Sequence, residues 1–357
     1  MKKERAVVAM SGGVDSSVAA ALLVEQGFET IGVTLQLLPG APTGFGCCGS
    51  PADIADAKAV ASRLNIPHYV VTTDELFEDK VIRPFVESYL QGDTPNPCAL
   101  CNRFVKFGHL LGLSQAWNAR FLATGHYARV QDGKLYRARD ENKDQTYFLY
   151  NLGSRELSRL IFPVGELSKP EVRNYARRLG LETAEKPESQ EICFIPNRDY
   201  RGFVKSHPLS SQMSSALKSG PIKDVSGKEI GRHEGTVGYT IGQRKGLVAG
   251  LMDPKYVVRL DPQNQTVIVG EKKETMASSF EVSDMSWTCG RPISGGRAEV
   301  RIRHRHAPAS SEFLLTESGR VRVHFDSPQR AITPGQSAVL YHGTEVVGGG
   351  TIREVLR

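Results

Sequence analysis

A glycine-rich turn that directly follows a short apolar run constrains this fold more than any other feature of the sequence. The apolar residues 6–10 lead into the turn Ser11-Gly12-Gly13-Val14-Asp15-Ser16 and then into a helix-forming stretch that ends near Gly27. Because glycine has no side chain, the backbone at Gly12 and Gly13 can approach an anion closely, and the next helix directs its positive end to the same point. The turn is neither a Walker A loop nor a Gly-x-Gly-x-x-Gly dinucleotide motif. It predicts a phosphate-binding site of another kind.

Asp15 is unusual in an anion-binding turn, because its own negative charge repels phosphate. Its presence fits a Mg²⁺ ligand, or a group that orients the turn, better than a direct contact with a nucleotide. The alternative interpretation of the whole segment is an ordinary glycine-rich turn followed by a serine helix cap.

Strand-like and helical segments alternate through the first 130 residues. Strands are predicted at 30–35, 68–71 and 121–124, and a helix at 52–65. Such alternation is typical of an α/β domain with a Rossmann-like parallel sheet. Ligands of these sheets bind at the carboxyl ends of the strands, where the turn, Leu35 and Gly125-His126 are expected to meet.

The rest of the chain has a different character. Residues 206–219 are rich in serine and predict a linker or mobile loop, and beyond 230 short β-branched runs alternate with turn residues. We therefore predict three domains: a catalytic domain at 1–203, a small central domain at 204–274 and a C-terminal β-barrel at 275–357. No apolar stretch approaches a membrane span, and no signal peptide is evident, so a cytoplasmic protein is expected.

Three of the six cysteines are candidates for catalysis or metal binding. Asn96 and Pro97 predict the start of a helix that would hold Cys98 and Cys101 three residues apart near its N-terminus, where thiolates are favoured. Cys193 lies in a strand-like segment at 189–195. The other cysteines have no predicted functional role. Cys289 is interpreted as a small buried residue, and no function is assigned to Cys47 and Cys48.

Several segments in order then resemble one known family. They are the turn at 11–16, Asn96–Asn102, Thr124–Tyr127, Lys143–Leu149, Ser189–Ile195 and Tyr239–Arg244. Together they resemble the tRNA-specific 2-thiouridylases of the MnmA family, within the PP-loop ATP pyrophosphatase superfamily. The resemblance implies replacement of the 2-oxygen of the tRNA wobble uridine by sulfur, after adenylation of that oxygen with ATP and Mg²⁺.

The resemblance also implies site residues. In its persulfide scheme Cys193 carries the incoming sulfur and Cys101 acts as a nucleophile, with a disulfide forming between them. The sulfur would come from a cysteine desulfurase, directly or through a relay protein. The residues implied in ATP binding are Ala9, Met10, Ser11, Gly12, Gly13, Val14, Asp15, Ser16, Leu35 and Gly125.

Cys98 departs from the family pattern, which often has an acidic residue there. Cys98, Cys101 and Cys193 could hold three irons of a 4Fe–4S cluster, and this is the metal site predicted here. Zinc is a competing metal. A metal-free persulfide route and an inert Cys98 are the open alternatives.

Contacts with tRNA are expected in the central domain, in the last domain and near the active site. Arg301, Arg303 and Arg305 would share one face of a strand, as suits phosphate binding, although a charged face exposed to solvent is the simpler alternative. The resemblance implies tRNA contacts at His126, Lys143, Asp144, Gln145, Arg303, His304 and Gln336. 

His304 stands where the family often has tyrosine. The expected substrates are the lysine, glutamate and glutamine tRNAs, with no membrane partner.

Three rival functions remain open at this point. The chain could be another PP-loop adenylating enzyme, which would not need Cys101 and Cys193. It could be a non-catalytic tRNA-binding iron–sulfur protein, which would not release AMP and pyrophosphate. It could also thiolate a different nucleotide.

Overall fold

The computed structural model describes residues 3–39, 49–187, 192–211, 214–247 and 253–356. The N-terminal domain is built on a five-stranded parallel sheet with the strand order β3-β2-β1-β4-β7. The predicted parallel sheet is confirmed, and the strands predicted at 30–35, 68–71 and 121–124 each lie within two residues of an observed strand. The strands are β1 (Arg5–Ala9), β2 (Glu29–Gln36), β3 (His68–Thr72), β4 (Phe121–Thr124) and β7 (Leu160–Ile161).

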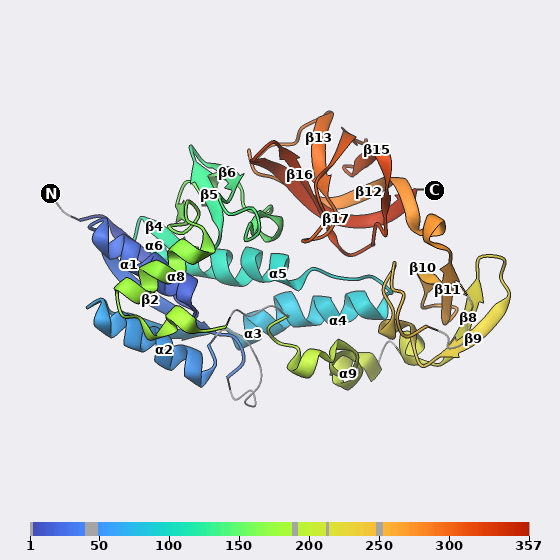
Figure 1. The fold of residues 1–357 in the computed structure, drawn as a ribbon, viewed down its shortest axis with the longest axis horizontal. Helices are drawn as coiled ribbons and strands as arrows, with labels where there is room; N and C mark the ends of the chain where they lie inside the picture. The colour runs from blue at the N-terminus through green and yellow to red at the C-terminus, as the bar shows by residue number, and fades with distance from the viewer. Residues whose placement is uncertain (1–2, 40–48, 188–191, 212–213, 248–252, 357) are drawn as a thin grey trace.

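Helices cover both faces of this sheet (Figure 1). Adjacent residues of β1 show this, because Val7 packs into one hydrophobic cluster and Val8 into another. A strand that is buried on both faces is apolar along its whole length, which explains the run at 6–10. The helices are α1 (Val14–Glu25), α2 (Pro51–Arg63), α3 (Asp74–Phe77), α4 (Arg83–Leu90), α5 (Pro97–Leu100), α6 (Leu110–Ala116), α7 (Ser154–Leu157), α8 (Lys169–Arg178) and α9 (Tyr200–Ser206).

Local sequence signals set several helix ends. Gly27 follows α1 with φ +86°, a conformation that glycine adopts without strain. The Asn96 side chain accepts a hydrogen bond from Ala99 N at the start of α5, with Pro97 in the first turn. The helix then continues as a π-helix over Cys101–His109 before α6 begins. The predicted helix around Cys98 and Cys101 is therefore present, with a widened segment that sequence reasoning did not anticipate.

The central part of the chain forms a four-stranded sheet with the order β10-β11-β8-β9. Its strands are β8 (Gly220–Asp224), β9 (Glu229–His233), β10 (Tyr256–Asp261) and β11 (Thr266–Gly270). The serine-rich stretch before it was expected to be a linker or mobile loop. Its described residues instead form short 3₁₀ turns, in which Ser210 and Ala216 are buried.

The C-terminal strands close into a six-stranded barrel, as predicted, because β12 pairs with both β15 and β17. They are β12 (Met276–Trp287), β13 (Gly295–Arg301), β14 (Ala309–Leu315), β15 (Val321–Arg330), β16 (Ser337–His342) and β17 (Glu345–Leu356). The predicted strand through Arg305 is wrong, because β13 ends at Arg301 and a turn with a bond from His306 N to Arg303 O follows. The three arginines therefore do not share a strand face.

A hairpin of the N-terminal domain joins the barrel. Strands β5 (Ala128–Gln131) and β6 (Lys134–Arg137) extend the barrel sheet, since Tyr136 of β6 pairs with Glu345 of β17. Arg137 N also donates to Thr344 O at 2.8 Å. The first and last domains therefore share backbone hydrogen bonds. Figure 1 shows the hairpin beside the barrel.

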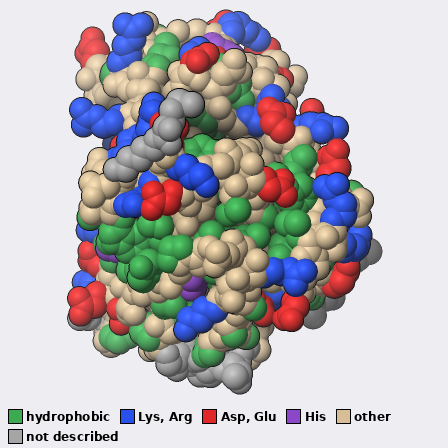
Figure 2. Space-filling model, turned by 90° about the vertical axis from the view of Figure 1, so that its left-hand side faces the viewer, with side chains coloured by type: hydrophobic (Ala, Val, Ile, Leu, Met, Phe, Trp, Pro, Cys, Tyr) green, Lys and Arg blue, Asp and Glu red, His purple; other side chains and the backbone are tan. Residues whose placement is uncertain are grey.

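The surface at the end of the molecule formed by the N-terminal domain mixes charges of both signs around hydrophobic side chains (Figure 2). Among the described residues, no helix is long and apolar enough to cross a membrane.

Candidate active site

A pocket of about 330 Å³ lies at the carboxyl ends of β1, β2 and β4. Every residue predicted to bind ATP lines it except Gly12. Its size is that of a small-ligand site, and its position is the one at which parallel sheets bind ligands. The pocket is lined by Ala9, Met10, Ser11, Gly13, Val14, Asp15, Ser16, Leu35 and Gly125, among others.

The glycine-rich turn is held by its own hydroxyl groups. Ser16 Oγ donates to Gly13 O at 3.0 Å and accepts from Ser11 N at 3.1 Å. Gly12 has φ +71°, and a Cβ there would overlap the backbone of Asp53 in α2. Gly13 is the N-cap of α1 and provides no side-chain cap, so backbone N–H groups of the first turn remain available to an anion.

Asp15 is paired with a lysine from a distant helix. Lys169 Nζ lies 2.7 Å from Asp15 Oδ1 and 2.9 Å from Oδ2, and Tyr127 OH donates to Oδ1 at 2.9 Å. The Lys169 side chain is only 9% exposed. Lys169 thus neutralises the carboxylate that would repel phosphate, which favours the orienting role of Asp15 over the role of a metal ligand.

A second lysine reaches the turn from the segment that precedes Cys193. Lys186 Nζ donates to Gly12 O at 3.1 Å, to Asp53 Oδ1 at 2.8 Å and to Asp56. Burial alone would lower the pKa of Lys186, but the hydrogen bonds with Asp53 and Asp56 raise it. Sequence reasoning missed both lysines, because their partners lie far away in the chain. The sequence showed only that both side chains are positively charged.

The same pocket contains three of the residues implied in tRNA binding, which are His126, Lys143 and Gln145. His126 Nδ1 lies 2.7 Å from Thr124 Oγ1, and burial lowers the pKa of His126 to about 3, with a further contribution from Lys106. The imidazole is therefore neutral at physiological pH. Gln145 Oε1 accepts from Tyr127 N at 2.9 Å, which ties it to the residue that contacts Asp15.

The remaining residues implied in tRNA binding lie at the junction with the barrel. The Asp144 side chain is 1% exposed and pairs with Arg301 at 2.9 Å, so its carboxylate holds the two domains together. Gln336 Nε2 donates to Thr94 O and Pro95 O at 3.0 and 3.1 Å. Arg303 and His304 are exposed, and the His304 ring lies 4.7 Å from that of Phe148.

The structure does not support the predicted metal site at the cysteines. Cys98 is exposed, whereas Cys101 is 7% exposed and packs into the core. Cys193 is partly exposed and lies in a turn, so the predicted strand at this position is also wrong. Within the described ranges, no three His, Cys, Asp or Glu side chains are grouped as metal ligands. The structure therefore gives no support to the predicted 4Fe–4S cluster or to zinc at this position.

Two other expectations concern the remaining cysteines. Cys289 was expected to be buried, but it is exposed and its Sγ donates to Arg291 O at 3.3 Å. Cys47 and Cys48 lie outside the described residues.

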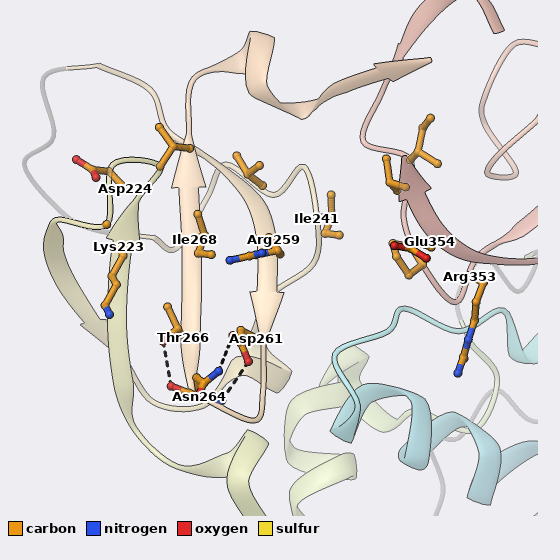
Figure 3. Close-up of a pocket in the computed structure, with 16 residues that line it drawn as sticks. Lys223, Asp224, Ile241, Arg259, Asp261, Asn264, Thr266, Ile268, Arg353 and Glu354 are labelled. Atoms are coloured by element: carbon orange, nitrogen blue, oxygen red, sulfur yellow. Dashed lines mark hydrogen bonds between the residues drawn. The ribbon is translucent and has the colours of Figure 1, made fainter. Parts of the chain in front are cut away.

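A larger pocket of about 780 Å³ separates the central sheet from the barrel (Figure 3). It carries as many basic as acidic side chains, and Asp224 and Asp261 already accept hydrogen bonds within their own turns. The basic residues are Lys223, Arg259 and Arg353, and the third acidic residue is Glu354. Balanced charge and the distance from the phosphate turn in the fold make this pocket a weaker candidate for the chemistry.

The parallel sheet with its phosphate-binding turn, the central sheet and the closed barrel define a HUP-domain protein with two further β domains. The family model described as "tRNA methyl transferase HUP domain" matches residues 4–197. Models described as "tRNA methyl transferase PRC-barrel domain" and "Aminomethyltransferase beta-barrel domain" match residues 209–271 and 277–352.

The chain belongs to the family of tRNA-specific 2-thiouridylases, MnmA. It is 45% identical to the protein of that name from Solibacter usitatus, over 99% of this chain and 100% of the relative. It is 47% identical to the Moorella thermoacetica protein, over 98% of this chain and 99% of the relative. The Geobacter metallireducens protein is 45% identical, with 98% and 97% covered.

Proposed function

We propose that this chain is an ATP-dependent tRNA 2-thiouridylase that acts on the wobble uridine. One observation carries the proposal: the phosphate-binding turn and the residues His126, Lys143 and Gln145 line a single pocket. A nucleotide on the turn and a base turned out of the anticodon loop could therefore meet in one place. The names of the relatives support the same reaction.

The first step of the proposed reaction is adenylation. The 2-oxygen of uridine attacks the α-phosphorus of ATP, the bond from phosphorus to the bridging oxygen breaks, and pyrophosphate leaves as N3 loses its proton. Lys106, Lys143, Lys169 and Lys186 line the pocket and place positive charge where negative charge develops. Mg²⁺ would screen the phosphates when bound. Asp15 and Asp53 are carboxylates that line this pocket, and both are paired with lysine.

The second step replaces oxygen by sulfur. The terminal sulfur of a Cys193 persulfide attacks C2, the C2–oxygen bond breaks, and AMP leaves with that oxygen. The Cys101 thiolate then attacks the Cys193 sulfur, which leaves the other sulfur on C2 and forms a Cys101–Cys193 disulfide. A thiol reductant must restore both cysteines. The partial exposure of Cys193 supports loading by a cysteine desulfurase or a relay protein.

The proposal is tested by incubating the full chain with unmodified lysine, glutamate or glutamine tRNA, ATP, Mg²⁺ and a persulfide donor. We expect 2-thiouridine at the wobble position by nucleoside mass spectrometry, with AMP and pyrophosphate released. Thiolation at another position would make the chain a different tRNA thiolase. Absence of both products would favour a non-catalytic tRNA-binding protein, and AMP release without thiouridine another adenylating enzyme.

A further inference from the structure

A pocket of about 310 Å³ lies where the three domains meet. Thr94 comes from the segment before α5, Thr240 and Gly242 from the central domain, and Arg303 and Arg330 from the barrel. Gln336 also lines it and bonds to the backbone of Thr94, two residues before the cap of α5. The pocket therefore lies beside the chain segment that leads to Cys98 and Cys101.

Two guanidinium groups share this pocket without an acidic lining residue. Arg303 Nη1 donates to Arg330 O at 3.0 Å, and Arg330 Nη2 donates to Gly242 O at 3.1 Å. Neither arginine makes an ion pair within the described part of the chain. Burial, followed by the charge of Arg330, lowers the pKa of Arg303, in keeping with the close approach of the two side chains in this pocket.

Further groups suit a phosphate. Arg330 Nε is buried and has no hydrogen-bond partner among the described residues. Threonine hydroxyls from Thr94, Thr240 and Thr333 border the same space. Arginine and threonine side chains are common partners of RNA phosphates. The neighbouring larger pocket, which shares Ile241, balances its cations with carboxylates and lacks this excess of positive charge (Figure 3).

We propose that Arg303 and Arg330 together bind one phosphodiester of the tRNA, at the junction of the three domains. The inference rests on the proposed function for the identity of the RNA. It adds Arg330 to the residues that the sequence implied and gives Arg303 a phosphate as its ligand. A phosphate fixed here would hold the RNA backbone beside the segment that leads to Cys101.

The test measures the affinity of the full chain for an unmodified tRNA transcript at several salt concentrations. Each lost phosphate contact should reduce the slope of log affinity against log salt by roughly 0.7–0.9. We expect this change in R330Q, with affinity about tenfold weaker as a charge-assisted hydrogen bond is lost. R330K keeps the charge and should restore the slope. R322Q, an exposed change on the same strand, should bind like the wild type.

A wild-type slope in R330Q would overturn the proposal. Equal loss of slope in R330Q and R330K would also overturn it, because it would assign Arg330 only to the contacts with Gly242 and Tyr256. Inorganic phosphate and pyrophosphate are tested as competitors at constant ionic strength. If R330Q loses their binding but keeps the tRNA slope, the occupant is a free anion and not RNA. Since binding needs no turnover, failure of thiolation itself would be seen separately.

Discussion

Lys169 and Asp15 form an ion pair between the first turns of two helices that lie 154 residues apart in the sequence. Lys169 begins α8 and Asp15 lies in the first turn of α1. The pair neutralises the negative charge within the phosphate-binding turn, while Tyr127 holds the same carboxylate from a third segment. The anion site therefore depends on residues that lie outside the phosphate-binding turn itself.

Replacing this lysine should weaken nucleotide binding. In K169M the Asp15 carboxylate loses its cation, so we expect ATP to bind about tenfold more weakly and the free energy of unfolding to fall by about 1–3 kcal/mol. Calorimetric ATP titration and urea unfolding measure the two effects. K272M, at an exposed position, is the matched control. Unchanged ATP affinity in K169M would show that the pair is not needed for the anion site.

The close approach of β4 to α1 gives a second prediction. A Cβ at Gly125 would lie 2.5 Å from Ser16 N and 2.6 Å from Asp15 C. G125A should therefore displace the start of α1 and weaken ATP binding. G112A is the control, because a Cβ there meets nothing within 4 Å and should stabilise α6 by about 0.5–1 kcal/mol. Equal ATP affinity in the two variants would argue against the tight contact.

The Arg301–Asp144 pair gives a third prediction. Arg301 is 13% and Asp144 1% exposed, so R301M leaves a carboxylate buried without its cation and should lower the free energy of unfolding by about 3 kcal/mol or more. R297M removes an arginine of the same strand whose ion pairs are exposed, and should cost about 1 kcal/mol or less. Urea unfolding followed by tryptophan fluorescence compares them. Similar midpoints would contradict this reading of the interface.

His126 makes a prediction about pH. Its pKa falls from 6.5 to about 3 in the folded chain, so the unfolded chain binds a proton over this range that the folded chain does not. The contribution of His126 to the free energy of unfolding is therefore fully present above pH 6.5 and is lost as the pH falls toward 3. NMR should show His126 neutral at pH 5. H126Q should lose part of the acid sensitivity of unfolding, whereas H324Q, at an exposed position, should retain it.

Serine substitutions of the cysteines distinguish the proposed persulfide route from its alternatives. C101S and C193S should abolish 2-thiouridine while ATP still binds. C98S and C289S, at exposed positions, should remain within about twofold of the wild type, the scale of ordinary surface substitutions. Thiolation assays with metal-free protein measure this. Loss of activity in C98S would give Cys98 a role that its exposed position does not indicate.

Structural features that depend on residues close together in the sequence could be predicted from the sequence. The apolar run, Gly12, Gly27 and the Asn96–Pro97 cap predicted the strand, the turn and two helix ends because each acts through local backbone geometry. The strand pattern likewise predicted the parallel sheet and the barrel.

Pairs of residues that only the tertiary fold brings together could not be predicted from the sequence. Lys186 reaches Gly12 only because the fold returns the chain to α2, and Arg301 was interpreted as an RNA contact although it faces Asp144. The alternation at 301–305 predicted a strand, but the bond from His306 to Arg303 turns the chain after Arg301. Spacing suggested a joint site for Cys98 and Cys101, but Cys98 is exposed and Cys101 is buried.

The pairing of β6 with β17 has a consequence for synthesis on the ribosome. Lys134 and Glu345, which bond across this junction, are 211 residues apart. At typical elongation rates of about 5–20 residues per second, the edge of β6 stays open for roughly 10–40 seconds before its partner strand is made. The nascent N-terminal domain must therefore wait with an unpaired strand edge, exposed to other chains and to chaperones, until β17 has been synthesised.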